Sequence, residues 1–240
     1  MLKSTRNHWE QYWAGNNLLF TNKIVEELSP FLTDKKSILE IGAGSGTTSI
    51  KLAEYNTSVA CLDYSKNSAQ LIKSNMCKSD TKLQIVIGDA FNIPFRSESF
   101  DICFHQGFLE HFTNPEQLLK EQYRILKKDG VILIDVPQKY SLYTIKKHIL
   151  MRINKWFAGW ETEFSASQLN KLLNENGFSP LKTYGRFHIR NLDRIQMRYL
   201  KKRMLPMFIE DFYHNTIVKI ENSIIGNNIG FSVGIIARKV

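Results

Sequence analysis

Short apolar runs and segments with helical spacing alternate along the first 137 residues of the chain. Each run is continuously apolar, which is typical of strands buried on both faces of a sheet. Helices on both faces of a parallel sheet produce such burial, so the pattern predicts an α/β fold with a doubly wound, mostly parallel sheet. The predicted strands are SILEIG (37–42), SVACLD (58–63), LQIVIG (83–88), DICFHQ (101–106) and VILIDVP (131–137), and the predicted helices are TTSIKLAEY (47–55), SAQLIKSNM (68–76) and PEQLLKEQYRILKK (115–128).

The two ends of the chain have a different character. An N-terminal helical segment, residues 1–34, is predicted to carry an apolar face that ends at a proline, with the face made by Trp9, Trp13, Ile24, Val25 and Leu28 before Pro30. Past residue 137, a helix is predicted at 165–176, with Ser165 or Ser167 as N-cap and Gly177 as its stop. Further strands are predicted at 178–187 and 230–240, and two insertions, 138–164 and 188–224, interrupt this half.

The composition fits one ordinary folded unit. The chain has 240 residues, 43% of them hydrophobic, so residues 1–240 are read as a single domain. No stretch reaches the roughly 18 consecutive apolar residues of a transmembrane helix, and the first residues lack the apolar core of a secretory signal. We therefore expect a soluble, cytoplasmic protein. The three cysteines, Cys61, Cys77 and Cys103, have no CxxC pairing, which predicts buried free thiols and no metal site.

The formal net charge of +9 is concentrated in two segments. Residues 138–158 hold five basic residues and no acid, and residues 182–203 hold eight basic residues and one acid. The remainder of the chain is therefore slightly acidic. In the second segment, basic residues recur every fourth position, at Arg186, Arg190, Arg194, Arg198 and Lys202. If helical, they form a stripe suited to an anionic membrane or an acidic substrate, and the competing interpretation is an ordinary solvated helix.

The first predicted strand ends in a glycine-rich loop, Glu40-Ile41-Gly42-Ala43-Gly44-Ser45-Gly46. Glycines let backbone and ligand approach closely, and the following helix offers free N–H groups. Asp63, at the end of the next strand, can accept hydrogen bonds from both hydroxyls of a ribose, although a helix cap is the alternative. The third glycine comes one position too early for the dinucleotide fingerprint, which disfavours a nicotinamide oxidoreductase. Glu40 suits a ligand with positive charge, such as an amino or sulfonium group.

Five motifs in order carry a family resemblance: ILEIGAGSG, CLDYS, VIGDAFNIPF, FDICFHQGFLEHF and LKEQYRILKKDGVILIDVP. Together they resemble the class I S-adenosylmethionine-dependent methyltransferases, and within them the small-molecule branch typified by ubiquinone-biosynthesis enzymes. The resemblance covers roughly residues 35–180 and makes 35–137 the cofactor-binding half. It implies a Rossmann-like, seven-stranded sheet with an antiparallel last strand, helices on both faces, and the basic insertions as a lid.

The resemblance also implies roles for individual residues around S-adenosylmethionine. The methionine portion would be surrounded by Glu40, Gly42, Ala43, Gly44 and Gly46. The ribose would be held by Asp63, the adenine by Tyr64, Asp89 and the Ala90 backbone, and the methyl end by His105 and Gln106. A carboxylate such as Asp89 suits the exocyclic amino group of adenine, which can only donate, although Asp89 is also a candidate helix cap.

Methyl transfer requires alignment of the acceptor and, for a hydroxyl, removal of its proton. His111 is the first candidate for that base and His105 the second, because histidine titrates near neutral pH. The alternative is that His111 is structural or positions the acceptor. The chain lacks the Asn/Asp-Pro-Pro-Tyr motif of amino-directed nucleic-acid methyltransferases, which disfavours a base as acceptor.

We therefore predict methyl transfer to an oxygen or carbon of an amphipathic or anionic small molecule, such as a quinone, lipid or glycan precursor. The two basic insertions, with aromatic residues Tyr140, Tyr143, Trp156, Phe157 and Trp160 in the first, would cover the cleft and touch a membrane surface. The N-terminal aromatics Tyr12 and Trp13 are expected to pack as an ordinary helix in preference to closing over the cofactor. An RNA methyltransferase and a non-catalytic binding protein are the alternatives, and nucleic acid is the less favoured partner because no RNA-binding module is recognisable.

Overall fold

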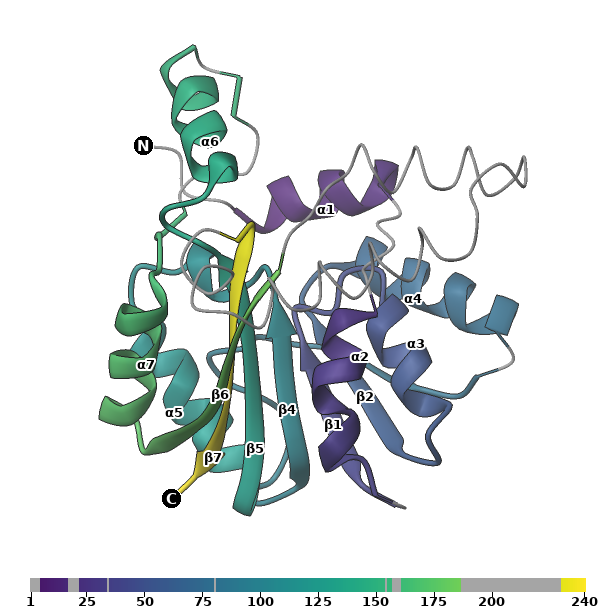
Figure 1. The fold of residues 1–240 in the computed structure, drawn as a ribbon. Coiled ribbons are helices and arrows are strands. Elements are labelled where there is room, and N and C mark those ends of the chain that lie inside the picture. The colour runs from purple at the N-terminus through teal and green to yellow at the C-terminus, as the bar shows by residue number, and fades with distance from the viewer. Residues whose placement is uncertain are drawn as a thin grey trace, which may run out of the picture.

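A computed structural model shows a seven-stranded sheet flanked by helices, with strand order β3-β2-β1-β4-β5-β7-β6 (Figure 1). It describes residues 5–16, 22–33, 35–79, 81–153, 155–156, 161–186 and 230–240. The strands are β1 (Ser37–Ile41), β2 (Ser58–Asp63), β3 (Gln84–Ile87), β4 (Phe100–Gln106), β5 (Leu126–Pro137), β6 (Phe178–Arg186) and β7 (Ser232–Lys239). The helices are α1 (Arg6–Gly15), α2 (Lys23–Leu28), α3 (Thr47–Ala53), α4 (Lys66–Ser79), α5 (Pro115–Ile125), α6 (Leu142–Arg152) and α7 (Ala166–Glu175), with short 3₁₀ helices η1 (Ser29–Phe31) and η2 (Leu109–His111).

The sheet is parallel except for its last strand in sequence. β1 pairs in parallel with β2 and β4, β2 with β3, and β4 with β5. β7 inserts between β5 and β6 and is antiparallel to both. The predicted doubly wound, seven-stranded sheet with an antiparallel last strand is therefore confirmed. From β1 the strand order runs outward in two directions, through β2 to β3 on one side and through β4 to β5 on the other. Where the strand order reverses in this way, a crevice opens at the carboxyl ends of the strands.

Side-chain alternation along the strands builds a separate core on each face of the sheet. On β1, Leu39 and Ile41 join the larger core, which also contains Leu118 of α5 and Leu169 of α7. Ile38, one position before Leu39, faces the core that is closed by α2. Figure 1 shows α5 and α7 grouped apart from α2 and α3. Helices on both faces explain why the strands are continuously apolar in sequence.

The observed elements depart from the predicted ones most clearly at the end of α5. The helical spacing predicts a helix through residue 128, but α5 ends at Ile125 and residues 126–128 belong to β5. Leu126 is fully buried and pairs with Phe100 of β4, so sheet pairing prevails over local helical spacing. The helix at α7 is as predicted, with Ser165 as N-cap in a capping box with Gln168.

The N-terminal segment does not form the single apolar face that its sequence suggests. It contains two helices, and α1 has no buried residue. The buried positions of α2, Ile24, Val25 and Leu28, pack into the core under the sheet. Trp9 and Trp13 of α1 instead lie over the carboxyl ends of the strands, as described below. The prediction that Trp9 and Trp13 share one apolar face with Ile24, Val25 and Leu28 is wrong, because α1 and α2 pack against different parts of the molecule.

The second half corrects two further expectations. Arg186, the first residue of the predicted basic helical stripe, lies in β6, and residues 190–202 of that stripe and the insertion 188–224 lie outside the described residues. Cys61 and Cys103 are buried in strands, but Cys77 on α4 is exposed, so the prediction of three buried thiols is wrong for Cys77. Among the described helices, none has the length and apolarity that crossing a bilayer requires.

Candidate active site

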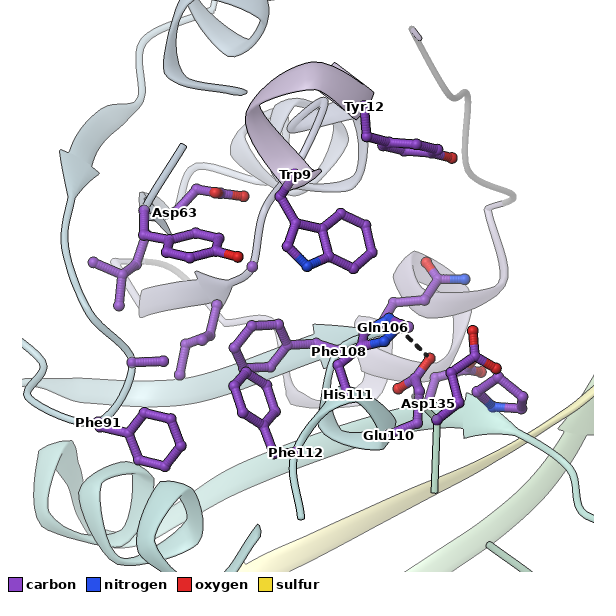
Figure 2. A pocket seen from close by; sticks show the side chains of 18 of the residues that line it. Trp9, Tyr12, Asp63, Phe91, Gln106, Phe108, Glu110, His111, Phe112 and Asp135 are labelled. Carbon is purple, nitrogen blue, oxygen red and sulfur yellow. Dashed lines mark ion pairs between the residues drawn. The ribbon is translucent and has the colours of Figure 1, made fainter. Parts of the chain in front are cut away.

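A cavity of about 880 Å³ opens at the carboxyl ends of the central strands (Figure 2). Residues that follow or end each of five strands line it: Gly42 after β1, Asp63 on β2, Asp89 after β3, Gln106 on β4 and Asp135 on β5. This is the crevice that the reversal of strand order at β1 creates. The cavity therefore brings four predicted site residues that are far apart in sequence, Gly42, Asp63, Asp89 and Gln106, to the carboxyl ends of the strands.

The glycine-rich loop reaches the cavity through Gly42, whereas the predicted site residues Ala43, Gly44 and Gly46 are not among the residues that line it. Gly42 and Gly44 have φ angles of +64° and +54°, in the left-handed region that side chains rarely adopt. A Cβ at Gly42 would overlap the Phe108 ring, and a Cβ at Gly44 would overlap the Trp13 ring. Both glycines are thus required by backbone conformation and by close packing. Gly46, also in the left-handed region, is the N-cap of α3.

Asp63 lines the cavity and is held by the same loop. Its Oδ2 accepts a hydrogen bond of 2.9 Å from the Gly44 N–H, and its Oδ1 accepts one of 2.9 Å from the Ser65 N–H. Burial raises the pKa of Asp63, and these two amides oppose the rise. Each carboxylate oxygen has a second lone pair, so Asp63 can still accept two hydrogen bonds from a ligand in the cavity.

Glu40 lies beneath the loop and does not line the cavity. It is 4% exposed, and its Oε2 accepts a hydrogen bond of 2.5 Å from the Ser49 hydroxyl. Burial raises the pKa of Glu40 to about 8, and the nearby Asp63 carboxylate adds to the rise. A cation bound at the loop would favour the ionised form of Glu40 and lower that pKa again.

The β2 and β3 ends bring together the three residues predicted at an adenine. Tyr64, Asp89 and Ala90 all line the cavity beside Asp63. Asp89 does not cap a helix, because the segment after it is a turn closed by a bridge between Asp89 and Asn92. Its Oδ1 accepts from the Phe91 N–H at 2.9 Å, which fixes the carboxylate at the rim.

His105 lies outside the cavity, in contrast to its predicted place at the methyl end. It is 0% exposed and follows the alternation of β4 that places Cys103 in the larger core. Burial lowers the pKa of His105 to about 3, so the ring is neutral. The next residue, Gln106, points to the other face and does line the cavity. Strand alternation therefore separates two neighbours that the sequence assigns to one site.

His111 lines the cavity from η2, together with its neighbour Glu110. The His111 Nε2 lies 4.0 Å from Glu110 Oε1, the pair joined by the dashed line in Figure 2. The ring of Trp9 packs edge-on against His111, with 4.8 Å between ring centres. Glu110 is 2% exposed, and burial and the Glu161 carboxylate raise its pKa well above the usual range. His111 is a predicted site residue, whereas Glu110, the adjacent acid in the EHF segment, was not predicted to belong to the site.

A polar network that no motif predicts closes the far end of the cavity. The Arg186 Nη2 donates to Asp135 Oδ1 at 3.1 Å, and its Nε donates to the Ser232 hydroxyl at 3.1 Å. With its amide oxygen turned toward the guanidinium, Gln106 accepts from Arg186 Nη2 at 2.8 Å. These residues come from β4, β5, β6 and β7, and Asp135 and Ser232 are 97 positions apart. Their proximity depends on the strand order, so local sequence patterns contain no signal for it.

α1 covers the cavity with aromatic side chains. Trp9, Tyr12 and Trp13 all line it, and Figure 2 shows Trp9 and Tyr12 descending from α1. Glu10 attaches α1 to the start of α4: its Oε1 accepts from the Lys66 N–H at 2.9 Å and its Oε2 from the Ser65 hydroxyl at 2.8 Å. The expectation that these aromatics pack as an ordinary helix is therefore wrong, because Glu10 holds the helix across the strand ends.

The first insertion also reaches the cavity. Tyr143 of α6 and Glu161 line its far end, where Phe231 packs against Tyr143 with 4.8 Å between ring centres. Lys147 of α6 is 2% exposed and lies 3.4 Å from Glu161 Oε2. The described part of the insertion thus contributes to the cover over the cavity.

Comparison with known proteins agrees with this geometry. A family model described as a methyltransferase domain matches residues 39–134, from β1 to β5. The chain is 22% identical over 190 residues to a protein of Mycolicibacterium smegmatis named as a probable S-adenosylmethionine-dependent methyltransferase, covering 79% of this chain and 68% of that protein. It is 24% identical to the ubiquinone biosynthesis O-methyltransferase of Pelagibacter ubique, covering 62% of this chain and 63% of the relative. The chain thus spans about two thirds of the length of these relatives.

Solved structures show the same fold. A crystal structure of an S-adenosylmethionine-dependent methyltransferase from Methanosarcina mazei superposes with a TM-score of 0.63 at 18% identity, covering 92% of this chain and 99% of that one. The matched domain, the relatives and the fold agree with the five ordered motifs of the sequence. The matched domain and the relatives support a class I S-adenosylmethionine-dependent methyltransferase.

Proposed function

We propose that this enzyme transfers the methyl group of S-adenosylmethionine to an oxygen or carbon of an amphipathic small molecule. The cofactor of the class supplies a methyl group already activated by a positively charged sulfur. One observation carries the proposal: a single cavity joins hydrogen-bond acceptors suited to a nucleoside, Asp63 and Asp89, to an aromatic compartment that ends in buried carboxyl groups.

The residues around the first half of the cavity fit the cofactor. Asp63 has two remaining acceptor positions for the ribose hydroxyls, and Tyr64 lies beside it for stacking on the adenine. Asp89 and the Ala90 backbone are placed for the amino edge of the adenine. We assign the methionine portion to the glycine-rich loop, with Glu40 beneath it as the compensating negative charge, and its methyl end to Gln106.

The second half of the cavity supports an amphipathic acceptor. Trp9, Tyr12, Phe108 and Phe112 provide apolar surface, and the polar network around Arg186 lies at the far end. At the far end, Arg186 already faces the Asp135 carboxylate, and Lys147, which is not among the lining residues, faces Glu161, so the described residues favour an amphipathic acceptor over an anionic one. The named activity of the Pelagibacter relative, in ubiquinone biosynthesis, agrees with that class.

For a hydroxyl acceptor, we assign proton removal to His111. The imidazole would accept the proton as the new oxygen–carbon bond forms and the sulfur–carbon bond breaks, leaving neutral S-adenosylhomocysteine. The imidazolium that results would lie 4.0 Å from Glu110, and its positive charge would lower the raised pKa of that carboxyl again and favour the ionised form as its partner. His105 is not given this role, because it is buried in the core outside the cavity.

Calorimetric titration with S-adenosylhomocysteine, with NAD as the control, tests the cofactor assignment. Micromolar binding of S-adenosylhomocysteine alone is expected, and binding of NAD alone would refute it. Methyl-labelled cofactor incubated with quinol and lipid extracts then identifies the acceptor, and His111→Gln should lower turnover while leaving S-adenosylhomocysteine affinity unchanged. Labelling of RNA, with binding that falls steeply as salt rises, would instead support the nucleic-acid alternative.

A further inference from the structure

The outer side of α6 presents a row of isoleucines to solvent. Ile145, Ile149 and Ile153 are 58%, 57% and 53% exposed. Because residues four positions apart lie one above the other on a helix, Ile145 and Ile149 are aligned on α6, and Ile153 follows them as its C-cap; we call the three residues the α6 isoleucine face. Tyr140, at the base of the helix, is 63% exposed. Large side chains exposed singly are ordinary, but an aligned group of them marks a contact surface.

Basic side chains border the α6 isoleucine face. Lys146, Arg152 and Lys155 are all exposed, and residues 138–156 contain no aspartate or glutamate. An apolar stripe flanked by lysine and arginine is the pattern of helices that lie in the interface of a membrane with anionic lipids. The long basic side chains can bury their stems and keep their charges at the headgroups.

The inner side of α6 is firmly attached, so the isoleucines are held outward. Lys147 is buried and lies 3.1 Å from Glu163 Oε1 and 3.4 Å from Glu161 Oε2. The Thr144 hydroxyl donates to the Gln138 carbonyl at 2.7 Å, and the Ser141 hydroxyl caps the helix start. In Figure 1, α6 projects beyond the strand ends. These contacts fix which side of the helix faces away from the protein.

We propose that the α6 isoleucine face binds the surface of an anionic phospholipid bilayer. At 11 residues, α6 is about 16 Å long, shorter than the roughly 30 Å hydrocarbon core, so it would lie in the plane of the membrane. The basic border matches the negative surface potential of anionic lipids. An acidic protein or a second copy of this chain would be the other occupants, and neither combines an apolar surface with a diffuse negative charge as a bilayer does.

The contact has a consequence for the acceptor, and this step rests on the proposed function. Tyr143, one position after the start of α6, lines the cavity. One side of α6 thus lines the cavity, and the α6 isoleucine face on the other side would contact the bilayer, so the cavity would lie next to the membrane surface. An amphipathic acceptor could then enter from the lipid without crossing water, which would keep its apolar part buried throughout.

Vesicle co-sedimentation of the full chain tests the proposal, with phosphatidylcholine vesicles containing phosphatidylglycerol compared with phosphatidylcholine alone. Binding is expected only with phosphatidylglycerol. Ile145→Ser/Ile149→Ser should lower the partition coefficient by roughly tenfold or more, since two half-exposed side chains lose their apolar burial. Lys146→Gln/Arg152→Gln should also lower it and reduce its salt dependence. The matched control is Leu181→Ser, which removes a 45% exposed leucine on β6, away from α6, and should bind as the unchanged protein does.

Several outcomes would overturn the proposal: no sedimentation with either vesicle, equal binding to both vesicles, equal loss in the Leu181→Ser control, or isoleucine variants that bind unchanged. Concentration-dependent dimerisation that the isoleucine substitutions abolish, without vesicle binding, would assign the face to a second copy. Calorimetry with S-adenosylhomocysteine on the same variants separates this from the proposed function. Loss of vesicle binding with unchanged cofactor affinity concerns the face alone, whereas absent cofactor affinity in the unchanged protein concerns the function.

Discussion

Replacing Asp63 by alanine should damage both the fold and the proposed cofactor site. In the structure, the carboxylate accepts one hydrogen bond from the Gly44 N–H and one from the Ser65 N–H, both at 2.9 Å. Asp63 is 7% exposed, so water does not readily replace the lost oxygens. The substitution would leave two buried backbone donors without acceptors.

The size of each effect follows from these contacts. An orphaned buried donor costs about 1–3 kcal/mol, so the free energy of unfolding should fall by at least about 2 kcal/mol. For a chain of this length that lowers Tm by about 4–8 °C or more. Two lost ribose hydrogen bonds to a charged acceptor remove about 3–6 kcal/mol of binding energy, which weakens S-adenosylhomocysteine by about a hundredfold or more.

Differential scanning calorimetry and isothermal titration measure the two effects on one preparation. Asp89→Ala is the matched control, because Asp89 is exposed and accepts one backbone bond, from Phe91, so its Tm should change little. An Asp63→Ala protein with unchanged Tm would contradict the structural argument. One that is destabilised yet keeps full S-adenosylhomocysteine affinity would refute the placement of the ribose.

Three further predictions concern the loop and the polar network. Glu40→Gln should flatten the pH dependence of stability. With a pKa of about 8, Glu40 holds in the folded state a proton that it loses on unfolding, so the free energy of unfolding of the unchanged protein falls between about pH 4.3 and pH 8. Chemical denaturation across that range measures this fall, and an equal fall in the variant and the unchanged protein would contradict the prediction. Gly44→Ala should lower Tm, because Gly44 has a φ of +54° and an added Cβ would overlap the Trp13 ring. In a double-mutant cycle, Trp13→Ala should restore part of that loss, whereas additive effects of the two substitutions would exclude the contact. Arg186→Met should lower the free energy of unfolding, measured in urea, by about 3–5 kcal/mol, because Asp135 stays buried without its guanidinium partner. Adding Asp135→Asn should recover most of that loss, and a double variant as unstable as the single one would contradict the prediction.

Much of the fold can be predicted from the sequence because it follows from the local periodicity of apolar positions. β2 begins and ends where its apolar run does, and the glycine-rich loop falls between β1 and α3 as expected. The exceptions are places where a distant partner decides. Leu126 leaves the helical pattern because Phe100 of β4 pairs with it, and Trp9 separates from the apolar face of α2 because α1 is tied to α4.

The candidate site divides along the same line. Asp63, Tyr64, Asp89 and Ala90 follow the ends of parallel strands, so order along the chain is sufficient to bring them to one cavity. His105 and Gln106 show the limit of that reasoning, because adjacent residues on a strand face opposite sides of the sheet. His105 enters the core, and Gln106 enters the cavity.

By itself, then, the sequence determined the α/β architecture, the class of cofactor and the residues that follow each parallel strand, because these depend on local apolar periodicity and on short motifs in order along the chain. The tertiary structure alone decided the far end of the cavity. Asp135, Arg186 and Ser232 meet only because β7 inserts between β5 and β6, in a register that places Asp135 opposite Gly234 and Arg186 opposite Ser232. Strand order and register are set by the packing of the whole sheet, and no local pattern encodes them.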